Sequence, residues 1–159
     1  MAATARTSAG ILLHRVRDGE RQVLLGHMGG PFWVRKDEAA WSIFKGEYDP
    51  ATEDPLAAAR REFAEETGTA VPAGEPVPLG EVRQSGGKRV VAWAVEGEID
   101  AEAVVSATFA MEWPPRSGRQ SEFPEIDRAA WFDLATARAK LVRAQVAFLD
   151  ALEEAVGAG

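Results

Sequence analysis

The stretch EDPLAAARREFAEETG, residues 53–68, carries the clearest helix signal in this chain. Asp54 can cap a first helical turn, and Pro55 suits the first helical position, where a missing N–H costs nothing. Most of the residues that follow are good helix formers, and Gly68 is typical of the residue that ends a helix. The sequence therefore predicts a helix over residues 55–67.

Three glutamates of this helix share one face. Glu62, Glu65 and Glu66 are spaced i, i+3 and i+4, so they lie together, clear of the apolar stripe that contains Leu56 and Phe63. Taken alone, the three glutamates fit an ordinary solvated face better than a binding site. However, like charges at this spacing repel, and a hard divalent cation such as Mg²⁺ or Mn²⁺ would replace that repulsion by oxygen coordination.

The wider pattern resembles the signature box of the Nudix hydrolases. That box reads Gly, five residues, Glu, seven residues, and then Arg-Glu-apolar-x-Glu-Glu-x-Gly-apolar. Seven residues separate Glu53 from Arg61, and the match in type and spacing runs on to Gly68. There are two departures: six residues rather than five separate Gly46 from Glu53, and the last apolar position is Thr69.

The resemblance extends outside the box. The hexapeptide WSIFKG, residues 41–46, resembles the W-x-x-P-K-G segment that precedes the box in several members, with Phe44 in place of proline. Trp131-Phe132 resembles the aromatic pair that ends a late strand before a helix in this family. The order of strands and helices fits nearly the whole chain.

The rest of the chain reads as a single α/β (α+β) domain covering residues 1–159. Two apolar runs, 8–16 and 22–28, flank Asp18-Gly19 and predict a hairpin. Further strands are expected at 41–46, 77–84, 88–98, 106–113 and 126–132, loops at 29–40 and 114–124, and helices at 134–142 and 145–156. The resemblance implies that these elements form a Nudix-like mixed β-sheet sandwiched between α-helices.

The resemblance also implies an activity, the metal-dependent hydrolysis of a pyrophosphate bond in a nucleoside diphosphate linked to another moiety X. Mg²⁺ or Mn²⁺ would be the cofactor. Glu65 and Glu66 would be the principal metal ligands, and Glu62 a further ligand or the base that deprotonates the attacking water. Arg61 would hold a box carboxylate, Glu53, by a charge-assisted hydrogen bond.

Residues beyond the helix complete the implied site. The box glycines are Gly46 and Gly68, and the backbone carbonyl near Lys45 and Gly46 is a further possible metal ligand. Glu125 stands where some members carry an additional ligand or base, and two other acidic residues, Glu112 and Glu122, compete for that role. The candidate substrate contacts are Lys45 for phosphate, Trp33 for stacking on a base, and Arg116 and Arg119 for phosphate, each of which also has an ordinary structural reading.

Composition limits the partners. The chain has 159 residues with 18 basic and 25 acidic side chains, a net charge of −7. A surface of that sign repels phosphate backbones, so neither general nucleic-acid binding nor binding to anionic membranes is expected. Zero cysteines exclude disulfides, thiolate metal sites and cysteine nucleophiles, and fit a cytoplasmic location. The expected partner is a small-molecule nucleoside diphosphate derivative, and the sequence leaves open whether the chain forms a homo-oligomer.

Three alternatives to a hydrolase remain at this point. Some Nudix-like domains have lost catalysis and serve as nucleotide-binding or regulatory modules, but such loss usually damages the box glutamates, which are all present here. Isopentenyl-diphosphate isomerase shares the fold but depends on a cysteine, which this chain lacks. An unrelated domain with an acidic helix would have to match the box by coincidence. The resemblance does not identify the substrate.

Overall fold

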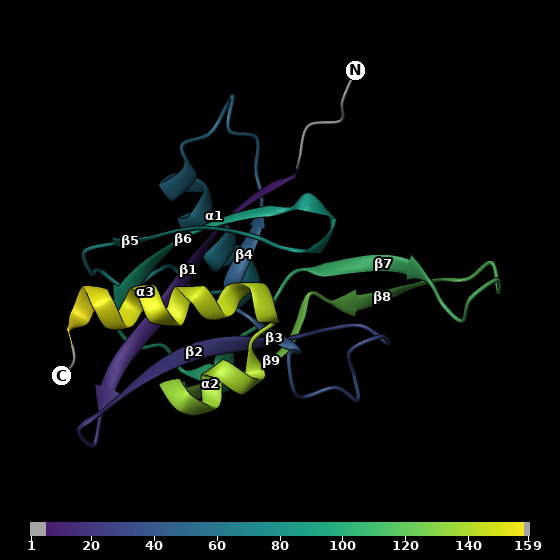
Figure 1. Cartoon of the computed structure of the whole chain (residues 1–159). Coiled ribbons are helices and arrows are strands. Elements are labelled where there is room, and N and C mark those ends of the chain that lie inside the picture. Colours follow the sequence, from purple (N-terminus) through teal and green to yellow (C-terminus); the bar gives the residue numbers. More distant parts are fainter. Residues whose placement is uncertain (1–5, 158–159) are drawn as a thin grey trace.

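The computed structural model describes residues 6–157, which form a seven-stranded mixed sheet with helices on both faces and a separate two-stranded ribbon (Figure 1). The strands of the sheet are β1 (Thr7–Arg17), β2 (Glu20–Met28), β3 (Trp41–Ser42), β4 (Phe44–Glu47), β5 (Val77–Arg83), β6 (Arg89–Glu96) and β9 (Ile126–Asp133). The ribbon consists of β7 (Thr108–Glu112) and β8 (Gln120–Pro124). The helices are α1 (Pro55–Thr67), α2 (Leu134–Lys140) and α3 (Val146–Val156), with 3₁₀ turns at Ser85–Gly87, Ala101–Ala103 and Arg143–Gln145.

The first two strands form the hairpin that the sequence predicts. Asp18 and Gly19 have φ values of 55° and 76°, and two-residue hairpin turns with positive φ at both positions suit the twist of the strands they join. Beyond this turn β1 pairs antiparallel with β2 from Arg17 to His14. On its other edge β1 pairs in parallel with β6. β1 is therefore an inner strand that contacts three others.

The segment 41–47 forms two short strands rather than the single strand expected at 41–46. β3 pairs with β2, and β4 pairs with the N-terminal part of β1. The break falls at Ile43, whose N–H donates to Gln145 Oε1 at 2.9 Å instead of to a neighbouring strand. β4 continues through Gly46 to Glu47, so Gly46 does not end the strand.

Side chains of β1 alternate between two cores, as the pleat of a strand requires. Ile11 and Leu13 join a buried cluster with Phe63 of α1, whereas Leu12 packs in a second cluster with Phe148 of α3. All five side chains are 0% exposed. The sheet thus separates α1 on one face from α2 and α3 on the other, which confirms the expected sandwich; α3 crosses the near face in Figure 1.

α1 begins and ends where the local sequence predicts. Asp54 Oδ2 accepts from Ala57 N at 3.1 Å, and Pro55 occupies the first helical position. At the other end Gly68 has a φ of 77° and its N–H donates to Ala64 O at 2.8 Å. Because both ends are fixed, the glutamates of α1 are held in one rotational phase relative to the sheet.

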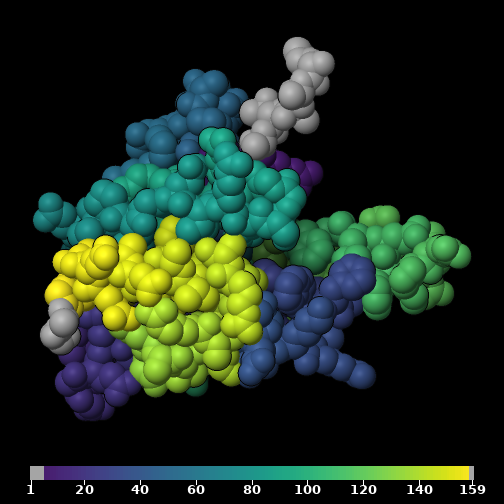
Figure 2. All heavy atoms as spheres, in the orientation of Figure 1, coloured from purple at the N-terminus to yellow at the C-terminus, as the bar shows by residue number. Residues whose placement is uncertain are grey.

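The ribbon corrects one expectation, because residues 120–124 form β8 rather than part of a loop. β8 pairs with β7 in a register that sets Phe123 opposite Phe109, with ring centroids 5.9 Å apart. Pro114 and Gly118 do mark a turn, but the turn is confined to the tip of the ribbon. In the space-filling view the ribbon (green) projects from one side of the molecule (Figure 2).

The C-terminal helices agree with the expectation apart from their exact ends. The side chain of Asp133 caps α2 by accepting from Thr136 N at 2.7 Å. Gln145, expected to begin the last helix, ends a 3₁₀ turn instead and is fully buried. Among residues 6–157, no helix has the length and apolar character that crossing a membrane would demand.

Candidate active site

A pocket of about 330 Å³, the carboxylate pocket, gathers most of the acidic residues that the sequence singles out. Three of its carboxylates come from α1, one from β4 and one from the residue that precedes β9. Its acidic lining consists of Glu47, Glu62, Glu65, Glu66 and Glu125. Two lysines, Lys45 and Lys88, line the same pocket together with Ser8, Gly46 and Ala107. The structure therefore brings Glu125, which is distant in sequence, to the glutamates of the box.

The three glutamates of α1 differ in exposure. Glu62 and Glu66 are only 7% and 8% exposed, whereas the Glu65 side chain is 50% exposed. Glu62 and Glu66 therefore do not lie on an ordinary solvated face, the interpretation that the helix taken alone would favour. β4 packs against α1 on that side, and Gly46 in particular lies directly against the Glu62 carboxylate.

Burial and mutual repulsion oppose ionisation in this pocket. Burial, together with the charges of Glu125 and Glu62, raises the pKa of Glu66 to about 8. Burial also raises the pKa of Glu62, although a hydrogen bond from Arg61 opposes the effect, and it raises the pKa of Glu125. Carboxyl groups with raised pKa values in a pocket are typical of functional sites.

Gly46 is required by contact rather than by backbone conformation. A Cβ atom placed on Gly46 would lie 1.8 Å from Glu62 Oε2. Gly46 lies within β4 and pairs with Ala9 in the sheet. The segment between Gly46 and Glu53, one residue longer than in the box pattern, contains a turn in which the N–H groups of Thr52 and Glu53 both donate to Asp49 O at 3.0 Å.

Arg61 ties together the acidic residues at the start of the pocket. Its Nε and Nη2 donate to the two oxygens of Glu53 at 2.9 and 2.8 Å, a two-pronged arrangement. Its Nη1 donates to Glu62 Oε1 at 2.8 Å and reaches Glu65 Oε1 at 3.3 Å. The Arg61 guanidinium holds the pKa of Glu53 below its usual range.

The donor set suits a hard divalent cation. The potential ligands are carboxylate oxygens, which Mg²⁺ and Mn²⁺ prefer, with no sulfur and no imidazole among the pocket residues. Within residues 6–157, no three acidic or histidine side chains are already spaced to bind one ion, and Glu62 and Glu65 instead share Arg61 Nη1. Glu62, Glu65, Glu66 and Glu125 are the residues that could hold the cation.

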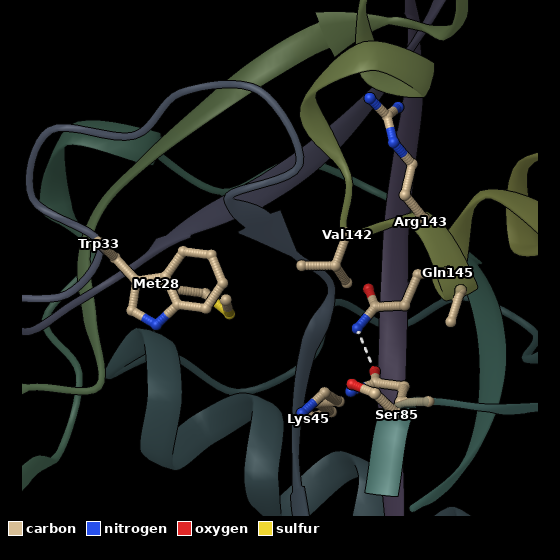
Figure 3. Close-up of a pocket in the computed structure, with 9 residues that line it drawn as sticks. Met28, Trp33, Lys45, Ser85, Val142, Arg143 and Gln145 are labelled. Atoms are coloured by element: carbon tan, nitrogen blue, oxygen red, sulfur yellow. Dashed lines mark hydrogen bonds between the residues drawn. The ribbon is translucent and has the colours of Figure 1, made fainter.

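A second cavity of about 380 Å³, the Trp33 pocket, adjoins this site through Lys45, which lines both. Its lining is Met28, Trp33, Lys45, Gln84, Ser85, Val142, Arg143, Ala144 and Gln145. Trp33 lies across from Lys45 and Ser85, while the guanidinium of Arg143 extends away from them (Figure 3). Burial lowers the pKa of Lys45, an effect that Lys88 increases.

Four residues considered from the sequence lie on the ribbon. Arg116 and Arg119 are in the turn at its tip, where Arg116 N donates to Glu112 Oε1 at 2.8 Å. Glu122 pairs across the ribbon with Ala110. None of the four charged residues lines the carboxylate pocket or the Trp33 pocket. Of the three acidic candidates outside the box, the structure brings only Glu125 to the box glutamates.

Sequence reasoning missed several residues that line these pockets, among them Lys88, Gln84 and Gln145. Lys88 follows the Gly86-Gly87 turn just before β6. A basic side chain next to a turn and a strand end is the sequence feature that could have identified it. Gln84 directly follows β5, and Gln145 lies in the segment that the sequence predicts as the last helix. No local pattern distinguishes either glutamine, because their role depends on contact between β3, β5 and the C-terminal turn.

Comparison with known proteins gives the family. The NUDIX domain model matches residues 5–152. An Ap4A hydrolase from C. elegans, solved as a binary complex, has a TM-score of 0.68 at 20% identity, with 98% of this chain and 100% of that chain covered. A mutT/nudix family protein from Listeria innocua has a TM-score of 0.62 at 18% identity, with coverage of 97% and 96%.

A third similar structure is the NUDIX domain of Shewanella oneidensis NrtR complexed with ADP ribose, with a TM-score of 0.63 at 15% identity and coverage of 98% and 91%. No functionally curated protein sequence matches the chain. At these identities the solved structures establish a shared fold. The family model covers most of the chain and includes the box on α1, and the chain therefore belongs to the Nudix hydrolase family.

Proposed function

We propose that this protein hydrolyses a pyrophosphate bond in a nucleoside diphosphate linked to another moiety, with Mg²⁺ or Mn²⁺ as cofactor. The observation that carries the proposal is the carboxylate pocket, where Glu62, Glu65 and Glu66 of α1 meet Glu125. A bound divalent cation supplies positive charge for the phosphoryl oxygens and for the attacking water. A pyrophosphate would otherwise be repelled by these carboxylates.

The residues of the box have different roles in this proposal. Glu65 and Glu66 act as principal ligands, and Glu62 acts as a further ligand or as the base that accepts the proton of the attacking water. Glu125 joins them from the opposite wall. Arg61 touches no substrate in this proposal, since it positions carboxylates through its bonds to Glu53 and Glu62.

The two lysines hold the phosphates, and the neighbouring cavity holds the rest of the substrate. Lys45 lines both the carboxylate pocket and the Trp33 pocket, so a pyrophosphate beside it can extend into either. Lys88 lies on the carboxylate side. The face of Trp33 offers a stacking surface for a base. Arg116 and Arg119 stay as candidate phosphate contacts only for a substrate long enough to reach the ribbon.

The test is hydrolysis of a panel of nucleoside diphosphate derivatives with Mg²⁺, with Mn²⁺ and with a chelator. At least one compound should be cleaved with metal, cleavage should stop with the chelator, and added metal should restore it. Glu66→Gln should lower kcat by at least about a hundredfold, or ~2.7 kcal/mol of barrier. Glu75→Gln, the same change in a loop outside the pocket, should leave kcat unchanged.

The competing function is a nucleotide-binding module without catalysis. Its support is the structural likeness to the NrtR domain that was solved with ADP ribose. The same panel separates the two functions when binding is measured alongside turnover. Tight binding of a nucleoside diphosphate derivative without cleavage, in either metal, would replace the hydrolase by the binding module.

A further inference from the structure

The orientation of one amide in the Trp33 pocket is fixed by a chain of hydrogen bonds that starts at the backbone. Ile43 N–H can only donate, and it meets Gln145 Oε1 at 2.9 Å. That bond identifies which end of the buried Gln145 amide is oxygen. The Gln145 Nε2 must then donate, and it does so to Ser42 Oγ at 3.0 Å, while Ser42 Oγ donates to Ile43 O at 2.7 Å.

The orientation of Gln145 also fixes the orientation of the Gln84 amide. Gln145 Nε2 also donates to Gln84 Oε1 at 2.9 Å, the bond drawn as a dashed line in Figure 3. The oxygen of Gln84 therefore faces Gln145, and its NH₂ group faces the other way. Gln84 is only partly buried and lines the Trp33 pocket. Among residues 6–157, no side-chain or backbone acceptor receives a hydrogen bond from Gln84 Nε2.

Lys45, which reaches this pocket from the side of the carboxylate pocket, is also a donor. Lys45 carries three N–H donors and no acceptor, and no carboxylate lines the Trp33 pocket. The Ser85 hydroxyl can donate or accept, so it does not discriminate. Met28 and Val142 add apolar surface beside the indole of Trp33. A ligand here meets an aromatic face and an edge of oriented donors.

Nucleobases differ in how they meet such an edge. Guanine and thymine present a carbonyl acceptor where adenine and cytosine present an amino donor. We infer that Gln84, oriented by Gln145, makes the Trp33 pocket selective for a nucleobase with an oxo group over the equivalent base with an amino group. This inference rests on the proposed function, which puts a nucleoside next to the carboxylate pocket.

The size of the effect follows from the cost of an unmade hydrogen bond. An amino group facing the Gln84 NH₂ would leave two donors opposed and unpaired, whereas an oxo group would accept. Such a mismatch separates matched ligands by at least about fivefold in Kd, and by more where the site is dry. The stacking contribution of Trp33 is nearly the same for both members of a pair, so it cancels.

Two pairs of mononucleotides test the inference, IMP against AMP and UMP against CMP, because each pair exchanges an oxo group for an amino group on one ring, and with it the neighbouring ring N–H for a bare ring nitrogen. Monophosphates contain no pyrophosphate bond, so they are not consumed. Calorimetric titration with Mg²⁺ present should give at least about fivefold tighter binding of IMP and of UMP. Equal affinities within either pair, amino preference or no measurable binding would overturn the inference.

Two substitutions at Gln84 make the assignment specific. Gln84→Glu keeps an oxygen for Gln145 and turns the other end into an acceptor, so it should reverse the preference toward AMP and CMP. Gln84→Met keeps the volume without polarity and should bring the two affinities within about twofold of each other. Gln120→Glu, which adds the same charge on the ribbon, should keep the wild-type preference. An unchanged ratio in Gln84→Glu would show that Gln84 does not read the base.

The outcome is separable from that of the hydrolysis panel. An oxo preference without turnover of any pyrophosphate would leave the inference standing and overturn the hydrolase. Turnover of oxo and amino substrates at equal kcat/KM, together with equal mononucleotide affinities, would leave the hydrolase standing and overturn the inference. Circular dichroism and Tm of each Gln84 variant establish that it is folded, which the partial exposure of this side chain favours.

Discussion

Among single residues, Arg61 contacts three acidic side chains at once and binds one of them through two nitrogens. Its planar fork donates to both oxygens of Glu53 while the remaining nitrogen contacts Glu62 and Glu65. A guanidinium presents five N–H donors in fixed directions, whereas an ammonium is a point charge on a flexible stem. The charge alone is therefore not what this position requires.

Arg61→Lys should lower kcat by at least about tenfold, or ~1.4 kcal/mol of barrier. The reason is that Glu53 and Glu62 lose their common orientation while the net charge is unchanged. Steady-state kinetics on whichever panel compound is cleaved give the measurement, and Arg60→Lys, the same change on the adjacent exposed residue, is the control. Wild-type kcat in Arg61→Lys would show that the fork has no positioning role.

Gly46→Ala should reduce activity by displacing the carboxylate of Glu62. The added Cβ would lie 1.8 Å from Glu62 Oε2, and a side-chain end can move more easily than the strand can. We expect Tm to change little and kcat to fall by about tenfold or more. Since the effect acts through Glu62, Gly46→Ala should have little further effect in a Glu62→Gln background. Additive losses would place the cause elsewhere.

At the scale of the element, α1 carries carboxylates that lower the stability of the fold when they are ionised and that the proposed function requires. A negative charge is less favourable on Glu66 than on the adjacent Glu65. Glu66 is buried near Glu125, whereas Glu65 is half exposed and contacts Arg61. Burial raises the pKa of Glu66 to about 8. Ionising it in the folded protein thus opposes folding once the pH exceeds the ordinary value of the carboxyl group.

Glu66→Gln should therefore raise Tm by a few degrees in chelator at pH 8, with a difference that disappears toward pH 4.5. The sign follows from linkage: an acid whose pKa is higher when folded destabilises the fold as pH rises from its unfolded value, near 4.5, toward about 8. With excess Mg²⁺ the difference should shrink or reverse, since the wild type binds the cation better and binding stabilises the fold.

The matched control for this helix is Glu75→Gln, which removes an exposed charge from the loop before β5. It should leave Tm unchanged in chelator and in Mg²⁺. The measurement is thermal unfolding followed by far-ultraviolet circular dichroism at several pH values. If Glu66→Gln melts as the wild type does in both conditions, Glu66 is neither destabilising nor a ligand.

Local sequence signals predicted α1, whereas the burial of Glu62 and the strand β8 depend on contacts between residues distant in sequence. Asp54, Pro55 and Gly68 act within a single turn, so their effects can be read from neighbouring residues. The burial of Glu62 depends on β4, and β8 exists because Phe123 meets Phe109 across a turn. Pairing of this kind is set by partners distant in sequence, so a local reading of Pro and Gly extended the loop too far.

The candidate site divides in the same way. The helical spacing predicted which glutamates would share a face, and the resemblance to the Nudix box implied that Arg61 would hold Glu53, to which it does donate. That Glu125 rather than Glu112 or Glu122 joins them follows from the register of the ribbon and β9, which no periodicity encodes. The pairing of Gln145 with Gln84 likewise needs a contact between residues separated by 61 positions.

At the scale of the whole molecule, the two cores share β1, so both faces of the sheet depend on one strand. His14 lies on this strand, is 4% exposed, and its Nδ1 is 2.8 Å from Arg21 Nη1. Arginine can only donate, so Nδ1 accepts and the ring is neutral. Burial, with a further contribution from Arg21 that Glu96 opposes, holds the pKa of His14 below its usual value.

The contribution of His14 to stability should therefore be lost in mild acid. A histidine whose pKa is lower when folded contributes stability above its unfolded value, near 6.5, and that stability is lost as the pH falls below it. Because the raised pKa of Glu66 acts in the opposite direction over this range, we expect Tm in chelator to change between pH 7 and pH 5.5 in a single transition, with the wild type losing a few degrees relative to His14→Gln. In His14→Gln this His14-dependent part of the slope should be absent, and an identical slope would assign it to another group.

The ribbon of β7 and β8 is anchored at its base, where Glu125 N donates to Ala107 O at 2.9 Å, and it also contacts the loop 29–40, where the rings of Phe32 and Trp113 lie with centroids 5.6 Å apart. Within residues 6–157, neither of its strands pairs with the main sheet. Insertions, deletions and fused sequences at its tip would therefore leave the hydrophobic cores untouched, as exposed loop tips generally allow. A longer, shorter or exchanged ribbon can thus change what the molecule recognises while the residues of the carboxylate pocket keep their positions.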